Sequence, residues 1–243
     1  MAYPYNLEMP ALFKIVKKEF LQDLVQGKLF MNNLQFFVDL EKKTGKQGVG
    51  DIREGSLLKI SKHKLFIQYD GGERKEVEIG PPPGIIYDET ALEHPVFCMV
   101  GKIFIQEKVG DGEYACTISL DRDLLNDFTE GNDKDYSVVL IFNVIDFLDR
   151  LEKAIKKAGL SGKSGFINYR NLSLPKIVDG KWILDDTFTK DNRFKKQSEY
   201  RIELFKQSKE PFVLEIGDIS DIAVVLEVEQ IEKGLSIIQR INE

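Results

Sequence analysis

The sequence predicts an α+β fold, in which a mixed, mostly antiparallel and twisted sheet packs against a few helices. Segments with alternating apolar and polar residues recur along the 243 residues and are separated by Gly-containing turns, which is typical of paired strands. No repeat of fixed period is present. We therefore expect a single domain over 1–243. Residues 80–84, where three prolines precede a glycine, form either a stiff connection, which we favour, or a subdomain boundary.

Composition and charge narrow the classes of function. Hydrophobic residues make up 42% of the chain, and the formal net charge of -6 argues against nucleic acid as the main partner, because phosphate binding draws on an excess of Lys and Arg. The first ten residues lack the apolar core of a signal peptide. The most apolar stretch, 137–148, is too short to span a bilayer as a helix. We expect a cytoplasmic protein without membrane contact, in which Cys98 and Cys116 are buried thiols.

The first third of the chain predicts a helix, a strand, a second helix and then paired strands. Apolar spacing predicts a helix over 17–26 that Gly27 ends. A strand at 28–31 follows, and Asn33 can cap the next helix. Further strands are expected at 57–60, 65–69 and 73–79, in the order of a β-meander.

Beyond the prolines, turn residues separate the predicted strands. Gly101 and Lys102 are expected to divide two strands, 96–100 and 103–107, and a glycine-rich turn leads to a third at 114–119. Asp121 is a candidate N-cap for a short helix that reaches residue 128.

The middle of the chain carries the two clearest patterns. A run of β-branched and aromatic residues over 136–142 predicts a strand buried on both faces, our candidate for the centre of the sheet. An amphipathic helix is predicted after it at 144–158. The segment 229–241 is also predicted to be a helix. Later strands are expected at 165–169, 176–178, 182–184, 200–205, 212–216 and 222–228.

Familiar catalytic and cofactor signatures are absent from the sequence. There is no phosphate-binding loop, dinucleotide-binding glycine motif or nucleophile elbow. The two histidines, His63 and His94, have no neighbours at metal-ligand spacing. We therefore expect no metal site and no resident cofactor.

The first candidate site is the glycine-flanked loop that ends at Gly55. Asp51, Arg53 and Glu54 can project from this loop around a ligand. The alternative is a solvated turn held by local ion pairs, each of which contributes roughly 0–1 kcal/mol.

The second candidate site is the strand that contains Glu199 and Arg201. The period of two places Gln197, Glu199, Arg201 and Glu203 on one face. If that face lines a cleft, Glu199 can bind a ribose hydroxyl or stabilise a developing cation, and Arg201 can hold an anion. The alternative is an amphipathic strand whose polar face is exposed to solvent.

A third candidate is the pair Tyr169 and Arg170 at the end of a predicted strand. An aromatic ring beside a guanidinium can stack a base and clamp a phosphate. The alternative is a packing role, since strand ends often carry such residues.

Several segments together form a recognisable pattern: 12–14, 27–34 with Phe36, Phe37 and Glu41, 50–55, 194–201 and 216–219. Through these segments, which span most of the chain, the sequence resembles a family of uncharacterised proteins of phages, prophages and their Gram-positive hosts. That family is also loosely similar to mobile-element proteins in which a Glu-aromatic-Arg strand has invited comparison with ADP-ribosyltransferase-like folds. This comparison implies a catalytic role for Glu199, which begins such a triplet here.

Two hypotheses for the function follow. The first is a phage or prophage accessory protein that binds a host protein or nucleotide in the host cytoplasm, in defence or counter-defence, without turnover. The alternative is an ADP-ribosyltransferase-like enzyme that uses NAD, with Glu199 as the catalytic carboxylate and Tyr169 stacked on the nicotinamide or adenine. Convergence of the candidate residues on one pocket would favour the enzyme, and their dispersal would favour the binding protein.

Overall fold

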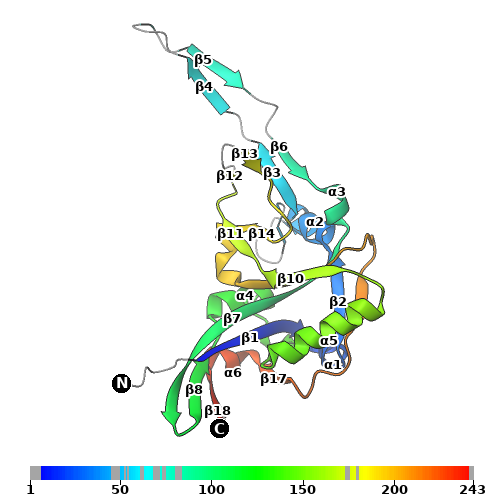
Figure 1. Cartoon of the computed structure of the whole chain (residues 1–243), viewed down its shortest axis with the longest axis vertical. Helices are drawn as coiled ribbons and strands as arrows, with labels where there is room; N and C mark the ends of the chain where they lie inside the picture. The colour runs from blue at the N-terminus through cyan, green and yellow to red at the C-terminus, as the bar shows by residue number, and fades with distance from the viewer. Residues whose placement is uncertain are drawn as a thin grey trace.

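The computed structural model describes residues 7–44, 50–51, 53, 55–60, 63–67, 72, 75–79, 84–172, 176–178 and 181–240. A ten-stranded sheet forms the body of the molecule, and all of its strand pairs are antiparallel. Helices pack against this sheet, and a two-stranded arm extends away from it (Figure 1). The predicted α+β class, with a mostly antiparallel sheet, is confirmed.

Six strands form the main path across the sheet. Their order in space is β10 (Gly162–Phe166), β15 (Glu199–Leu204), β7 (Pro95–Gly110), β1 (Leu7–Lys17), β9 (Tyr136–Ile141) and β17 (Ala223–Glu227). The central pair is therefore β7 and β1. The strand that we predicted at the centre, β9, is buried as expected but lies next to the outermost strand, β17.

The longest strand, β7, changes partners along its length. Its first half pairs with β15 and with β2 (Lys28–Asn33), its middle with β1 and its end with β8 (Glu113–Ile118). Two further strands extend the sheet, since β16 (Phe212–Glu215) pairs with β2 and β18 (Leu235–Arg240) pairs with β8.

The prediction of two strands separated at Gly101 was wrong, because β7 continues through this glycine. The absence of a side chain at Gly101 serves packing. A Cβ atom built there would lie 2.6 Å from the ring of Phe166 and 3.1 Å from Tyr200. The glycine therefore leaves room for the Phe166 ring, which meets the Tyr200 ring edge to face with 5.2 Å between their centroids.

The extended arm is a nested pair of ladders. The chain runs out along β3 (Ser56–Ile60) and β4 (His63–Ile67) and returns along β5 (Lys75–Ile79) and β6 (Gly84–Tyr87). Since β3 pairs with β6 and β4 with β5, the predicted β-meander was wrong. Residues 80–83, at the proposed boundary, lie outside the described residues.

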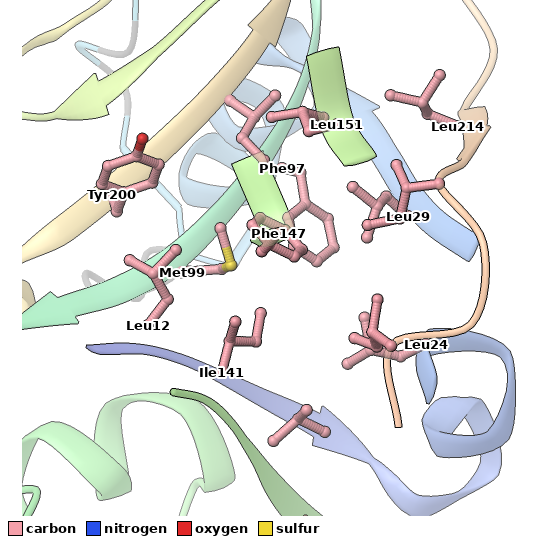
Figure 2. Close-up of a cluster of buried hydrophobic side chains, with 14 of the residues drawn as sticks. Leu12, Leu24, Leu29, Phe97, Met99, Ile141, Phe147, Leu151, Tyr200 and Leu214 are labelled. Atoms are coloured by element: carbon pink, nitrogen blue, oxygen red, sulfur yellow. The ribbon is translucent and has the colours of Figure 1, made fainter. Parts of the chain in front are cut away.

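Helices cover both faces of the sheet. On one face, α1 (Lys18–Val25) and α5 (Val144–Lys157) contribute Leu24, Phe147 and Leu151 to a cluster with Leu12 of β1 (Figure 2). On the other face, α4 (Arg122–Thr129) and α6 (Val228–Lys233) pack on Ala11 and Phe13. Alternating residues of β1 thus belong to two cores, as expected for a strand between two layers.

The helix termini follow the sequence signals closely. Gly27 follows α1 with a φ of +80°, and Gly159 follows α5 with a φ of +67°. The next helix, α2 (Leu34–Thr44), is capped by Asn33, whose Oδ1 accepts the Phe36 N–H at 2.9 Å. Asp121 precedes α4 as predicted, although its side chain makes no capping hydrogen bond.

Short elements complete the described chain. These are α3 (Glu89–Leu92), the 3₁₀ turns η1 (Asp133–Asp135) and η2 (Asn192–Gln197), the antiparallel hairpin of β12 (Lys176–Val178) and β13 (Lys181–Ile183), and the parallel pair of β11 (Asn168–Arg170) and β14 (Thr189–Asp191). Within the described ranges, none of the helices has the length and apolar character needed to cross a membrane.

Candidate functional site

The polar face of β15 is buried. Glu199 is 5% exposed, and Arg201 and Glu203 are each 1% exposed. Residues that contact this face include Thr187 and Lys190, which lie just before and within β14. The face is therefore not the solvent-exposed side of an amphipathic strand, and its charges must be matched inside the protein.

Glu199 is held by two cations. Its Oε2 accepts a hydrogen bond from Lys190 Nζ at 2.6 Å, and its Oε1 pairs with Arg201 Nη2 at 2.6 Å and with Arg201 Nε at 2.8 Å. Burial by itself would raise the pKa of Glu199, but Arg201 and Lys190 outweigh burial and hold that pKa far below its ordinary value. The carboxylate is therefore ionised, and both of its oxygens are engaged.

The rest of the β15 face is tied to neighbouring segments in the same way. Arg201 Nη1 donates to the carbonyl of Thr187, and the hydroxyl of Thr187 donates to Glu203. The other oxygen of Glu203 lies 2.7 Å from His94 Nδ1. Each charged side chain of this face thus has an internal partner.

Tyr169 and Arg170 also make internal contacts. The Tyr169 hydroxyl accepts the backbone N–H of Glu199 at 2.8 Å, and burial raises the pKa of this tyrosine to about 12. Arg170 forms a two-pronged pair with Asp185, in which Nε lies 2.7 Å from Oδ1. The ring and the guanidinium anchor the start of β15 and the loop before β14.

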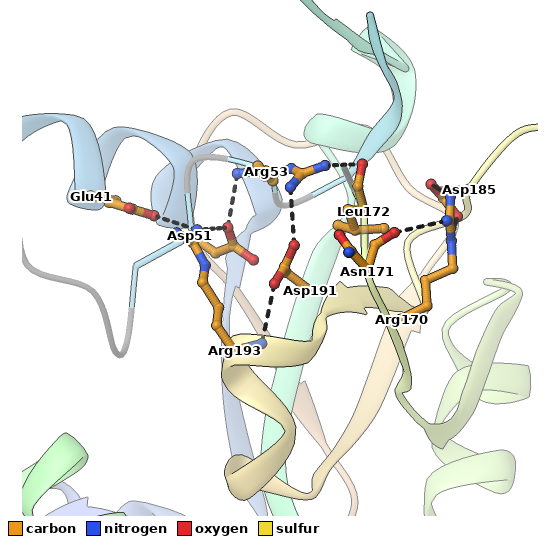
Figure 3. A network of polar contacts seen from close by, with 9 residues as sticks. All are labelled: Glu41, Asp51, Arg53, Arg170, Asn171, Leu172, Asp185, Asp191 and Arg193. Carbon is orange, nitrogen blue, oxygen red and sulfur yellow. Dashed lines mark hydrogen bonds and ion pairs between the residues drawn. The ribbon is translucent and has the colours of Figure 1, made fainter. Parts of the chain in front are cut away.

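The loop at Asp51 belongs to a second buried network (Figure 3). Asp51 Oδ1 accepts the Arg53 N–H at 2.9 Å and pairs with Arg193 at 3.2 Å. Arg53 reaches Asp191 at 3.0 Å. Asp51 and Arg53 are buried, so these two side chains do not belong to a solvated turn. Glu54 lies outside the described residues.

One short strand connects the two networks. In β14, Lys190 binds Glu199 and the next residue, Asp191, binds Arg53. The two candidate loci are therefore neighbours within the fold, although their charges are directed into separate ion-pair networks. Among the described candidates, only Glu199 lines the cavity considered next.

That cavity lies where the sheet opens. β1 leaves β7 after the pair Phe13–Val100, and β2 joins the same edge of β7 at Val96. Residues 97–99 of β7 lie between these pairs, and no described strand pairs with them on that edge. We call the resulting cavity, of about 560 Å³, the fork cavity.

Phenylalanines dominate the wall of the fork cavity. The aromatic lining comes from α1, β2, α2, β7 and α4, with Tyr136 at the start of β9; its phenylalanines are Phe20, Phe30, Phe36, Phe37, Phe97 and Phe128. Phe20, Phe30 and Phe36 are 54%, 56% and 44% exposed. Large apolar side chains gathered at an open cavity are typical of an interaction site.

Our sequence interpretation did not select these residues as a site. Phe20 belongs to the apolar spacing that predicts the helix over 17–26, and the apolar face of a helix usually packs in the core. The signal for a site was a surplus of phenylalanine close to the N-terminus, since Phe20, Phe30, Phe36 and Phe37 occur within 18 residues. A pattern of this kind does not show that β1 and β7 separate beside it.

Lys14 lies at the point where the two strands separate. Its Nζ donates to the carbonyl of Cys98 at 2.7 Å and stands 4.3 Å from the centre of the Phe97 ring. The ammonium thus bonds to a strand carbonyl that no neighbouring strand reaches. Burial lowers the pKa of Lys14 and raises that of the Cys98 thiol to about 12.

The described residues contain no group of three or more His, Cys, Asp or Glu side chains arranged to hold a metal ion. Comparisons with protein-family models, curated proteins and solved structures found no match to this chain. The fork cavity and the buried networks beside it are the features of the described structure that indicate a function.

Proposed function

We propose that the chain is a binding protein that takes a host protein segment or a nucleotide into the fork cavity, without turnover. On the basis of the sequence resemblance, we infer that it is a phage or prophage accessory factor that acts on its host, in defence or counter-defence. One observation supports the proposal most directly. Exposed phenylalanines line the cavity and are available to a partner, whereas the carboxylate of Glu199 is already paired with two cations.

The state of Glu199 supports binding without turnover. A catalytic carboxylate must contact the substrate or exchange a proton with it. Here each oxygen of Glu199 already accepts from a cation at 2.6 Å, and its low pKa keeps it ionised. A substrate would have to displace Lys190 or Arg201 before it could use this group.

The cavity wall favours a protein segment over a nucleotide. The exposed Phe20, Phe30 and Phe36 match apolar side chains of a partner, which form the centre of most protein interfaces. A nucleotide phosphate needs several free cations, whereas Lys28 and Lys190 in this cavity are already paired with Asp23 and Glu199.

Capture from a bacterial lysate tests the proposal. The wild-type chain should enrich a partner that a Phe20→Ser/Phe30→Ser double variant loses, because both rings are more than half exposed and can be removed without opening the core. Ile145→Ser is the matched control, since this residue is 73% exposed on α5, outside the cavity. Nucleotide extracted from the purified chain is measured in parallel. The proposal fails if the double variant captures the same proteins as the wild type, or if neither a partner nor a nucleotide is found.

The alternative, an ADP-ribosyltransferase-like enzyme, is favoured by one observation. Glu199 lines the fork cavity beside Lys190 and Gln197, so it is within reach of a molecule bound there. In this proposal, NAD would enter the cavity and Glu199 would stabilise the positive charge that develops as nicotinamide leaves.

Release of nicotinamide from NAD by the purified chain tests the alternative. A catalytic Glu199 predicts that Glu199→Gln lowers the rate by at least about 100-fold, as for other electrostatic stabilisers. If the wild type releases no nicotinamide, or if the variant is as active as the wild type, Glu199 is not a catalytic residue.

A further inference from the structure

Among the described residues, one lysine of the fork cavity has no carboxylate within ion-pair distance. Four lysines line it, and three of them lie within ion-pair distance of a carboxylate. These pairs are Lys17–Glu19, Lys28–Asp23 and Lys190–Glu199, at 3.9, 2.8 and 2.6 Å. Among the residues that the structure describes, no carboxylate lies within this distance of Lys14. The Glu199 carboxylate acts on the Lys14 ammonium only from beyond ion-pair distance, so the ammonium has no direct carboxylate partner in the described cavity wall.

The environment of this charge suits a carboxylate. The Lys14 ammonium has three N–H donors, and the Cys98 carbonyl accepts one of them at 2.7 Å. A charge-assisted bond to a carboxylate would offset the cost of burying the ammonium. A single unmatched cation fits a monoanion better than a phosphate, which carries about 1.5–2 negative charges near neutral pH.

The rim of the cavity indicates that the carboxylate belongs to a chain. Phe20, Phe30, Phe36 and Val213 are each more than 40% exposed, so the apolar surface continues from the cavity onto the outside of the molecule. A small free acid would leave this rim in water. A polypeptide that leads out of the cavity would cover it.

We propose that the fork cavity binds the C-terminal residues of a partner protein. The terminal carboxylate pairs with Lys14, the last side chain is large and apolar and lies among the phenylalanines, and the preceding residues cover the exposed rim. This inference rests on the proposed binding function, for which it names the segment that is recognised.

Fluorescence anisotropy with a defined peptide pool tests the inference. The pool consists of labelled heptapeptides that are random at the first five positions and end in Leu-Phe with a free carboxylate. We expect the full chain to bind this pool at least about tenfold more tightly than the same pool with an amidated C-terminus. Equal affinity for the two pools, or binding of neither, would overturn the inference.

Variants at Lys14 separate charge from packing. Lys14→Met keeps an unbranched apolar side chain without the charge and should weaken binding of the acid pool at least about tenfold. Lys14→Arg should restore most of it. Lys18→Met is the control, since Lys18 pairs with Glu227 outside the cavity and should bind the pool like the wild type. Thermal unfolding checks that each variant is folded, and a folded Lys14→Met that binds normally contradicts the inference.

Two further ligands test the nature of the occupant. If 3-phenylpropionate binds as tightly as the acid pool, the rim is not used and the occupant is a small acid. If AMP binds more tightly than the pool, and Lys14→Met abolishes this binding, the occupant is a nucleotide. Either result overturns the assignment to a protein C-terminus.

The same variants distinguish this inference from the proposed function. If Lys14→Met still captures the lysate partner that Phe20→Ser/Phe30→Ser loses, the cavity is a protein-binding site but does not recognise a C-terminus. If the double variant captures the same proteins as the wild type, the proposed function itself fails.

Discussion

At the scale of single residues, the polar side chains of the sequence motifs form ion pairs inside the protein. Glu199, Arg201 and Lys190 are each at most 5% exposed, and their charges are matched within one cluster. Removal of one member leaves an uncompensated charge in a medium of low polarity. These side chains are therefore more sensitive to substitution than surface ion pairs.

Lys190→Met should destabilise the fold by about 3–5 kcal/mol, the usual cost of breaking a buried pair. Urea unfolding measures this cost. Lys156→Met is the control, because Lys156 pairs with Glu152 on the exposed side of α5 and its loss should leave the free energy of unfolding nearly unchanged. Equal effects of the two substitutions would show that the Lys190 pair is not stabilising.

The low pKa of Glu199 predicts a pH dependence of stability. In the unfolded chain a glutamate has a pKa of about 4.3, and in the folded chain the pKa of Glu199 lies below this. The unfolded state therefore binds more protons in acid, and the stability contributed by Glu199 is present above pH ~4.3 and lost as the pH falls towards the folded pKa.

Comparison with Glu199→Gln isolates this contribution. The free energy of unfolding of the wild type should exceed that of the variant by a constant amount between about pH 7 and 5, and the difference should shrink below about pH 4. Urea titrations across this range provide the measurement. A difference that stays constant to pH ~3 would mean that the pKa of Glu199 in the folded chain is not lowered.

At the scale of elements, the helix ends that we predicted from glycines were correct, and the strand break that we predicted at a glycine was wrong. Gly27 and Gly159 have positive φ, which a helix terminus often needs, so the sequence signal and its cause agree. Gly101 lies inside β7, where the reason for glycine is the close approach of the Phe166 ring from β10 and of the Tyr200 Cβ from β15. A local sequence window contains no information about those distant residues.

Gly101→Ala tests this interpretation of the strand. The new Cβ would lie 2.6 Å from Phe166, so we expect a loss of about 1–3 kcal/mol through overpacking. Gly165→Ala on β10 is the matched control, because the nearest atom to its new Cβ is 3.9 Å away. Urea unfolding compares the two, and equal stabilities would contradict the packing argument.

The strands missed by sequence reasoning share a physical cause. β1 contains Pro10, which counts against a strand in any local analysis, yet it lies at the centre of the sheet. β18 follows α6 after Gly234, whereas the tail pattern suggested one continuous helix. In both cases pairing with distant strands, β7 and β8, determines the structure.

The candidate site was predictable only in part. The sequence identified Glu199, Arg201, Asp51 and Arg53 as unusual, and the structure places all four in buried networks. It could not identify the fork cavity, because this depends on where β1 and β7 separate. A cavity formed between strands that lie some 80 residues apart in sequence leaves no local signal.

At the scale of the whole molecule, the position of each strand in the sheet predicts how well its amides are protected. β9 has a paired strand on both sides along most of its length, and β7 and β1 lie between other strands and are paired with at least one neighbour along their length, whereas β10 and β17 are the outermost strands of the main path. Interior strands open only with the whole domain, and outer strands open locally.

Hydrogen exchange measured by mass spectrometry tests this order. Peptides from β1, β7 and β9 should exchange most slowly, and peptides from β10 and β17 should exchange at least about tenfold faster. Slower exchange in β17 than in β1 would contradict the strand order described above.

The position of β15 and β17 also has a consequence for synthesis of the chain. Both strands come from the last fifth of the sequence, and they cover the outer edges of β7 and β9, which are made much earlier. Until residues 199–227 have left the ribosome, the nascent sheet presents two open edges, which are prone to pair with other chains. The yield of folded protein should therefore depend on chaperones that shield these edges while translation is still in progress.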